Sequence, residues 1–147
     1  MLGTSWQSRA VLVNKAIHNT VRERAAGRCE YCHLRQADDP FFRFAVDHII
    51  AEQHGGPTVL SNLALSCFRC NLHKGPNIAG RDRRTGKLVP LFHPRRHKWS
   101  RHFAWNGPYL VGRTAIGRVT IVVLAINHLD AVALRESLIL AGDFAAD

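Results

Sequence analysis

The sequence predicts an α+β fold organised around a four-cysteine metal site. A chain of 147 residues, 46% of them hydrophobic, is about the size of one domain and can bury a core. Short β-branched and aromatic runs alternate along it with helix-like patterns. All four cysteines fall into two CxxC pairs, Cys29 with Cys32 and Cys67 with Cys70. We therefore expect one ion to join the two pairs.

The segments around the first cysteine pair predict a helix, a strand and a loop. Residues 14–26, "NKAIHNTVRERAA", place apolar side chains among charged positions and precede Gly27, a suitable C-cap, so we expect an amphipathic N-terminal helix. Residues 41–50, "FFRFAVDHII", are aromatic and β-branched, which favours a strand. The Gly-Gly-Pro run at 55–57 then breaks regular structure, so a loop follows this strand.

A second strand and a helix flank the second cysteine pair. Residues 63–66, "LALS", are short and apolar, as in a buried strand. Residues 68–74, "FRCNLHK", have the pattern of opening helical turns, and Gly75 and Pro76 end the helix. Two strands followed by a helix therefore enclose the space between the cysteine pairs.

A basic segment and a hairpin come next along the chain. Residues 81–101 carry eight Lys or Arg against the single acid Asp82, with Phe92 interspersed among them, which is typical of a basic arm or loop. In "HFAWNGPYLVG" the Asn-Gly dipeptide at 106–107 separates two partly apolar runs, so we expect a C-terminal hairpin.

Two helical segments complete the predicted fold. Residues 115–126 are assigned to a helix, although their β-branched content also favours a strand, and residues 131–141 to a helix with Asp130 as N-cap and Gly142 as C-cap. The apolar content of this region predicts that it completes the core or forms a dimer face. The sequence leaves monomer and homodimer open.

We expect residues 1–147 to form a single domain with three parts. Its core covers about 28–76, its basic arm about 81–101, and its C-terminal packing region about 102–142. The most apolar stretch is too short to cross a bilayer, and the N-terminus lacks the pattern of a secretory signal, so we expect a cytoplasmic protein. Its cysteines are then metal ligands or free thiols rather than disulfides.

The charge of the chain predicts a polyanionic partner. Lys and Arg number 20 against 11 Asp and Glu, which gives a formal charge of +9. Such an excess favours nucleic acid, and phosphate neutralisation by a basic arm predicts salt-sensitive binding. The alternative is a basic protein without such a partner, whose arm is a solvated loop. Phe92 and Trp99 then anchor that loop to the core rather than stack on bases.

The cysteine spacing predicts a structural zinc site with no open position. Each CxxC pair can present two thiolates from one tight knuckle, and two knuckles complete a tetrahedral shell. The 34 residues between the pairs exceed the gap of a simple zinc ribbon, so a folded insert is expected. The alternative is a thioredoxin-like redox role, which needs only one pair in a βαβ context and leaves the second pair unexplained.

The insert resembles the zinc-stabilised form of the HNH endonuclease motif, whose fold is the ββα-metal finger. The residues that carry the resemblance are "VDHIIAEQHGGPTVLSNLALSCFRCNLHKG", and the match covers residues 28–75, about a third of the chain. The Asp-His pair, the Gly-Gly loop, the Asn-Leu strand start and the CxxCNxxKG block occur in the order of the family. The resemblance therefore implies a metal-dependent nuclease that produces 5′-phosphate and 3′-hydroxyl ends.

The resemblance also implies roles for individual residues. His48 would be the general base that activates water, since neutral imidazole is abundant at cellular pH. Asp47 and Asn71 would hold a divalent ion, Mg²⁺ or Mn²⁺, through hard oxygen ligands. Asn62 would brace the loop that carries His48, and Lys74 would neutralise a substrate phosphate. Adjacent residues of a flat strand face opposite sides, so Asp47 and His48 must lie at a strand end or strong twist.

Each of these residues also has a simpler interpretation. His48 could be an ordinary surface histidine, Asn62 a turn residue, Asn71 a helix-surface residue, and Lys74 a solvated cation at the end of its helix. At the level of the whole chain, the leading hypothesis is a metal-dependent HNH endonuclease that hydrolyses DNA. The main alternative is a non-catalytic zinc module that binds nucleic acid or protein, and a third is a zinc-stabilised toxin or partner domain directed at RNA.

Overall fold

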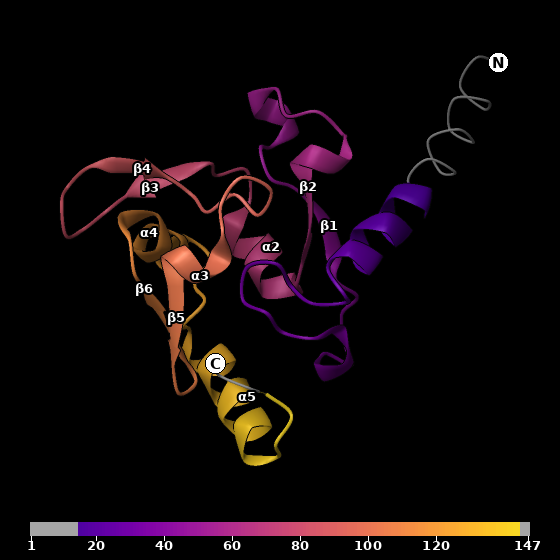
Figure 1. The fold of residues 1–147 in the computed structure, drawn as a ribbon, viewed down its shortest axis with the longest axis vertical. Coiled ribbons are helices and arrows are strands. Elements are labelled where there is room, and N and C mark those ends of the chain that lie inside the picture. Colours follow the sequence, from indigo (N-terminus) through magenta and orange to yellow (C-terminus); the bar gives the residue numbers. More distant parts are fainter. Residues whose placement is uncertain (1–14, 145–147) are drawn as a thin grey trace.

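The computed structural model describes residues 15–144, and its strands form three two-stranded antiparallel sheets within that range (Figure 1). A helix covers residues 15–24. The strands are β1 (Ala45–His48), β2 (Leu63–Ser66), β3 (Ala79–Arg81), β4 (Leu88–Pro90), β5 (Phe103–Asn106) and β6 (Tyr109–Gly112). The helices are α2 (Phe68–Lys74), α3 (Trp99–His102), α4 (Ala115–Val123) and α5 (Leu129–Leu140), and short 3-10 turns occur at η1 (Gln36–Asp38), η2 (Glu52–His54) and η3 (Leu60–Asn62).

The β1, β2 and α2 elements form the predicted ββα arrangement. The two strands pair antiparallel, with His48 opposite Leu63 at one end of the register. β2 is buried along its whole length, as its apolar sequence predicts. α2 begins directly after Cys67, whose Sγ caps the helix by accepting a hydrogen bond from Cys70 N at 3.4 Å. The predicted bounds of β2 and α2 are therefore confirmed.

The strand predicted for residues 41–50 is wrong at both ends, because β1 covers only Ala45–His48. Side chains bind the backbone N–H groups that a longer strand would need: Asp39 Oδ1 accepts from the amides of Phe41 and Phe42, and Gln36 Oε1 accepts from Phe44. Such local side-chain bonds compete with a strand ladder. The chain therefore enters β1 from a turn.

The N-terminal helix predicted for residues 14–26 is confirmed over residues 15–24 and ends two residues earlier than predicted, whereas Asn14 lies outside the described range. Ala26 and Gly27 follow it with positive φ values of 52° and 69°, and Gly27 N donates to Arg22 O. This left-handed turn ends the helix, as the glycine predicted. The chain then runs directly into the first cysteine pair.

The basic segment 81–101 is more regular than the predicted arm or loop. It contains part of the β3–β4 hairpin and the start of α3. Asp82 organises the hairpin turn: its backbone exchanges hydrogen bonds with Gly86 and Lys87, and its carboxylate accepts from Thr85 Oγ1 at 2.8 Å. The sequence pattern missed this hairpin because the turn depends on one buried acid within a basic run.

The C-terminal part contains the predicted hairpin and two helices, but the bounds of both helices and the N-cap of the second differ from the prediction, since α4 ends at Val123 and α5 covers Leu129–Leu140. The β5–β6 hairpin turns at Gly107, where φ is 58°, and α4 is a helix whose N-cap, Thr114, accepts a hydrogen bond from Gly117 N. α5 begins at Leu129, and its N-cap is His128 rather than Asp130, because His128 Nδ1 accepts from the Asp130 amide at 3.2 Å. Gly142 follows this helix with a φ of 77°, as a terminating glycine does.

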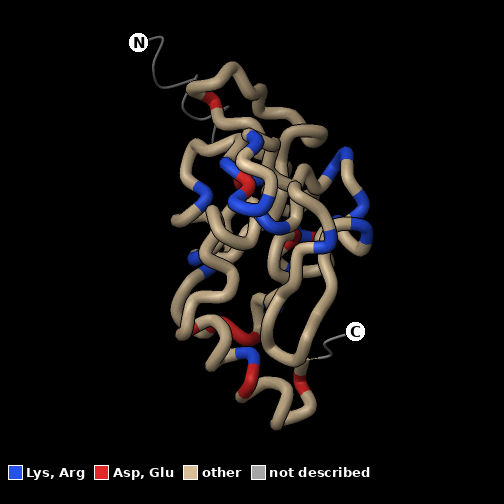
Figure 2. Tube along the Cα trace, turned by 90° about the vertical axis from the view of Figure 1, so that its left-hand side faces the viewer, with Lys and Arg blue, Asp and Glu red and all other residues tan. Residues whose placement is uncertain are grey.

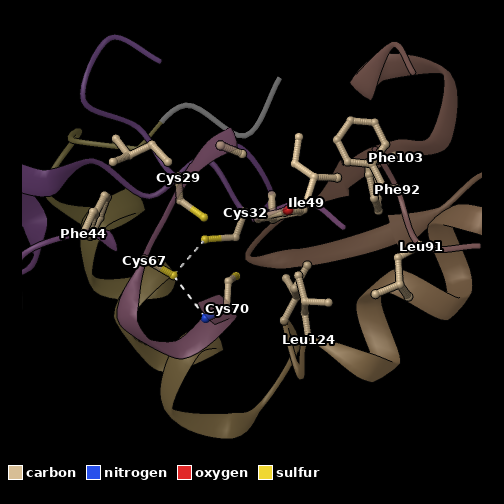
Figure 3. Close-up of a cluster of buried hydrophobic side chains, with 14 of the residues drawn as sticks. Cys29, Cys32, Phe44, Ile49, Cys67, Cys70, Leu91, Phe92, Phe103 and Leu124 are labelled. Carbon is tan, nitrogen blue, oxygen red and sulfur yellow. Dashed lines mark hydrogen bonds between the residues drawn. The ribbon is translucent and has the colours of Figure 1, made fainter. Parts of the chain in front are cut away.

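One cluster of buried side chains connects the ββα unit to the C-terminal part (Figure 3). It includes the four cysteines, Phe44 and Leu65 on one side and Phe92, Phe103 and Leu124 on the other. α4 packs closely on the β3–β4 hairpin, since a Cβ added at Gly80 would lie 2.7 Å from a Val119 methyl group. Within the described range, no helix has the length and apolar character needed to cross a membrane.

A buried ion pair fastens the β3–β4 hairpin to α4 and makes its stability depend on pH. Asp82, 2% exposed, accepts hydrogen bonds from Arg118 Nε at 3.1 Å and Nη2 at 2.9 Å. The Arg118 guanidinium holds the pKa of the Asp82 carboxyl well below its usual value of 3.8. A carboxyl whose pKa is lower in the folded protein than in the unfolded chain stabilises the fold at pH values above its unfolded-state pKa. This stability is lost as the pH falls toward the folded-state pKa.

We predict that Asp82→Asn lowers the melting temperature at pH 7, and that the difference from wild type shrinks below about pH 4, where the unfolded chain takes up the proton. Thermal unfolding followed by circular dichroism between pH 3 and pH 7 measures this. Glu136→Gln, at an exposed position of α5, is the control and should follow wild type throughout. An equal difference at pH 3 and pH 7 would contradict the prediction.

Candidate functional site

The four cysteines form a buried cluster with the geometry of a tetrahedral thiolate site. Their Sγ atoms all lie within 4.8 Å of one another, and those of Cys32 and Cys67 are 3.7 Å apart. Figure 3 shows the four side chains pointing toward one another from the two knuckles. A zinc–sulfur bond of about 2.3 Å in tetrahedral geometry requires sulfurs about 3.8 Å apart. The donor set and its spacing therefore fit Zn²⁺.

Local backbone structure brings each cysteine pair into this cluster. In the first knuckle, Cys29 N donates to Leu34 O at 2.8 Å and His33 N donates to Cys29 O at 2.9 Å, which folds the segment into a tight turn. In the second, the α2 cap places Cys67 and Cys70 one helical turn apart. Hydrogen bonding to Cys29 and to the other two sulfurs lowers the pKa of the Cys67 thiol, whereas hydrogen bonding within the same cluster raises the pKa of the Cys32 and Cys70 thiols.

A second site lies at the end of β1, where a cavity of about 420 Å³ opens beside α2. Three residues that the sequence singled out line it together: Asp47 and His48 from β1, and Asn71 from α2. Glu52 and Gln53 from η2 line it as well. Both Asp47 and His48 reach the cavity because His48 is the last residue of β1, as the strand-end prediction required.

Asp47 is the buried member of this group, with 7% of its surface exposed. Its Oδ2 accepts a hydrogen bond from Tyr31 Oη at 2.8 Å and lies 3.1 Å from Lys74 Nζ. Burial raises the pKa of the Asp47 carboxyl above its ordinary value, while the positive charge of Lys74 and the Tyr31 hydrogen bond oppose that rise. Removal of either partner would therefore favour a neutral acid at this position.

Lys74 is buried, so it is not placed to contact a substrate phosphate. It is 1% exposed, and its ammonium donates to Asp47 Oδ1 at 3.3 Å and to His48 O at 3.0 Å. An ammonium buried between two protein oxygens is not presented to a substrate, so the expected phosphate contact is corrected to an internal ion pair. The sequence pattern could not separate these roles, because a helix-terminal lysine suits both.

His48 is held through one of its ring nitrogens. Its Nε2 lies 2.8 Å from Thr58 Oγ1 and 3.2 Å from Glu52 Oε1, and the Thr58 hydroxyl is within 3.3 Å of the same Glu52 oxygen. The His48 side chain is 26% exposed. The ring is thus oriented by two residues of the following loop, and Nδ1 has no recorded hydrogen-bond partner among residues 15–144.

Asn62 makes the backbone contacts expected of a loop brace. Its side chain accepts from Ile50 N at 2.9 Å and donates to Ile50 O at 3.0 Å and Pro57 O at 2.9 Å. Gly56 lies against the same carbonyl of Ile50, where a Cβ would collide with it. These contacts hold the loop that carries Glu52 and Thr58 against the end of β1.

Asn71 is placed by the second zinc knuckle. It directly follows Cys70, and its backbone N donates to Cys67 O at 2.9 Å in the first turn of α2. Asn71 lines the cavity together with Asp47. A carboxylate oxygen and an amide oxygen are ligands that Mg²⁺ and Mn²⁺ accept, so this donor set fits a hard divalent ion with positions left for water and phosphate.

Sequence reasoning missed three residues of this site: Tyr31, Glu52 and Thr58. Tyr31 lies inside the first CxxC pair, and its contact with Asp47 depends on how β1 packs on the knuckle, which the motif does not reveal. Glu52 and Thr58 lie in a loop whose glycines predicted only irregular structure. Their approach to His48 follows from the brace by Asn62, which residue types alone do not reveal.

Basic and acidic residues are unevenly distributed over the fold. Lys and Arg outnumber Asp and Glu in the upper half of the view in Figure 2, whereas acids dominate its lower end. Seven of the eight Lys and Arg residues between 81 and 101 are exposed, and Arg95 is partly buried in an ion pair with Glu30. Phe92 is 2% exposed, and Trp99 Nε1 donates to Tyr31 O at 2.9 Å. Both aromatics therefore anchor this segment to the core.

Comparisons with known proteins agree with the motif. Residues 29–77 match the family model described as HNH endonuclease. The chain is also 28% identical over 119 residues to the Septu protein PtuB of Bacillus thuringiensis; the match covers 80% of this chain but 43%, less than half, of that protein. No solved structure matches significantly. The two strands, the helix and the four-cysteine cluster within residues 29–77 are consistent with the ββα-metal fold of the HNH endonuclease family that this segment matches.

Proposed function

We propose that this chain is a metal-dependent HNH endonuclease that hydrolyses DNA phosphodiester bonds. The observation that carries the proposal is the shared cavity of Asp47, His48 and Asn71, in which two candidate ion ligands lie beside a candidate base. Phosphodiester hydrolysis requires a base for the attacking water and a cation for the developing charge. The cavity offers groups for both, next to a cluster that we infer holds structural zinc.

In this proposal His48 is the general base, and Nδ1 is the nitrogen that receives the proton of water. Thr58 and Glu52 engage Nε2 at 2.8 Å and 3.2 Å. An imidazole whose Nε2–H is donated to a hydroxyl and a carboxylate keeps its lone pair on Nδ1. The loop contacts would thereby select the tautomer that catalysis needs.

Asp47 and Asn71 would hold Mg²⁺ or Mn²⁺ in the cavity. The bound ion would supply charge stabilisation for the phosphoryl group and the leaving oxygen. Lys74 would keep Asp47 ionised at a position where burial alone favours the neutral acid, since its ammonium lies 3.1 Å from the carboxylate. Asn62 would act indirectly, by fixing the loop against β1.

The exposed basic residues between 81 and 101 would bind the nucleic-acid backbone, which makes affinity fall as salt rises. We assign DNA as the substrate, and incubation with a labelled RNA strand in place of plasmid tests the RNA alternative. The second candidate function is a non-catalytic zinc module, because the Lys74 ammonium on Asp47 would also suit a purely structural carboxylate. Cleavage assays separate the two.

We predict that His48→Ala lowers the cleavage rate of supercoiled plasmid in Mg²⁺ or Mn²⁺ by about 100-fold or more, because general-base catalysis contributes at least that factor. Asn71→Ala should also impair cleavage, and both variants should retain their zinc. His54→Ala, which alters an exposed histidine outside the cavity, is the matched control and should cleave like wild type. Equal nicking by wild type and His48→Ala, or none with either ion, would leave the binding module as the better function.

For Lys74 we predict that replacement by Met destabilises the fold by about 3–5 kcal/mol, because it leaves the Asp47 carboxyl buried without its cation. Urea unfolding measures this, with the exposed Lys98→Met as control. If Lys74→Met instead keeps wild-type stability and binds DNA more weakly, Lys74 contacts phosphate as the sequence predicted.

A further inference from the structure

We propose that Tyr31 is a positioning residue for the candidate ion ligand Asp47, so that the first zinc knuckle sets the geometry of the cleavage site. Tyr31 lies between Cys29 and Cys32, and its hydroxyl donates to Asp47 Oδ2 at 2.8 Å. The inference rests on the proposed function and assigns to this knuckle a role in ion binding at the second site. This role is separate from zinc binding by the cysteines, because the Tyr31 hydroxyl makes the contact with Asp47.

The Tyr31 ring is fixed from several directions. The residue is fully buried, and its ring meets that of Phe92 edge to face, with centroids 6.5 Å apart. Its carbonyl oxygen accepts a hydrogen bond from Trp99 Nε1 at 2.9 Å. With the backbone held between two cysteines of the cluster, the hydroxyl has little freedom to move away from Asp47.

The Tyr31 hydroxyl supplies the hydrogen of this contact, since Asp47 Oδ2 lies 2.8 Å from it. A protonated phenol has one O–H to give, and in this structure it goes to the carboxylate. Phenylalanine would fill the same space without this bond.

The two carboxylate oxygens of Asp47 have different contacts. Oδ2 takes the Tyr31 hydroxyl at 2.8 Å and lies 3.1 Å from the Lys74 ammonium. Oδ1 has one longer contact, with the same ammonium at 3.3 Å. Oδ1 thus keeps a lone pair for a ligand in the cavity that Asp47 lines. Tyr31 thereby selects the oxygen that meets the ion.

Three chain segments converge on this one carboxylate. Asp47 itself belongs to β1, Tyr31 to the first knuckle and Lys74 to the last turn of α2, whose first turn carries Cys70. The four-cysteine cluster joins the knuckle to the helix. Groups that orient a metal ligand in this way typically change metal affinity or activity about 10- to 100-fold when they are removed.

The test is Tyr31→Phe in the full chain, with Mn²⁺ as the probe. Binding is measured from the electron paramagnetic resonance signal of free Mn²⁺, alongside zinc content, melting temperature and plasmid cleavage. We expect one zinc per chain, as in wild type, with Mn²⁺ affinity about 10- to 100-fold weaker and cleavage reduced. Tyr109→Phe removes the other tyrosine hydroxyl of the chain, on an exposed side chain, and should match wild type in every measurement.

A double-variant comparison keeps the test decisive. In an Asp47→Asn background, adding Tyr31→Phe should change Mn²⁺ affinity little further, because both substitutions act on one ligand. Wild-type Mn²⁺ affinity in Tyr31→Phe, additive effects in the double variant, or loss of zinc from Tyr31→Phe would each overturn the positioning role. If wild type itself neither binds Mn²⁺ nor cleaves, the proposed function fails instead.

Discussion

The convergence of four sulfur atoms from two distant knuckles is the constraint on which the rest of this structure depends. Cys32 and Cys67 are separated by 34 residues, yet their Sγ atoms lie 3.7 Å apart. An ion that closes such a loop contributes its binding free energy to folding. This closure positions the inserted β1–β2 hairpin and the start of α2. The positions of the residues in the candidate cleavage site therefore depend on the cluster.

A second polar cluster transmits that constraint to the cavity. Asp47, Lys74 and Tyr31 are all buried, and each comes from a different element of the domain. A buried carboxylate is costly unless it is paired and hydrogen-bonded, and here it has both an ammonium and a phenol. The same two partners that make burial of the acid tolerable also hold it in one orientation, so stability and ligand geometry share the same contacts.

Much of the fold and part of the site could be predicted from sequence, because local patterns decide them. The α2 bounds follow from a cysteine cap and a terminal Gly75, and Asp47, His48 and Asn71 come from a short motif with fixed spacing. The buried position of Lys74 and the hydrogen bond from Tyr31 could not be predicted, since they depend on how the first knuckle and α2 pack against β1. The β3–β4 hairpin was missed because its turn depends on a single buried acid within a basic run, Asp82, whose ion-pair partner Arg118 is far away in the chain.

Stepwise removal of zinc with a chelator tests most directly whether the four-cysteine cluster positions the candidate cleavage site. Zinc content and plasmid cleavage are followed in the same samples with Mg²⁺ in excess. We expect cleavage to fall in proportion to the zinc removed, to stay low when more Mg²⁺ is added, and to return when Zn²⁺ is added. Full cleavage by protein that has lost its zinc would contradict this expectation.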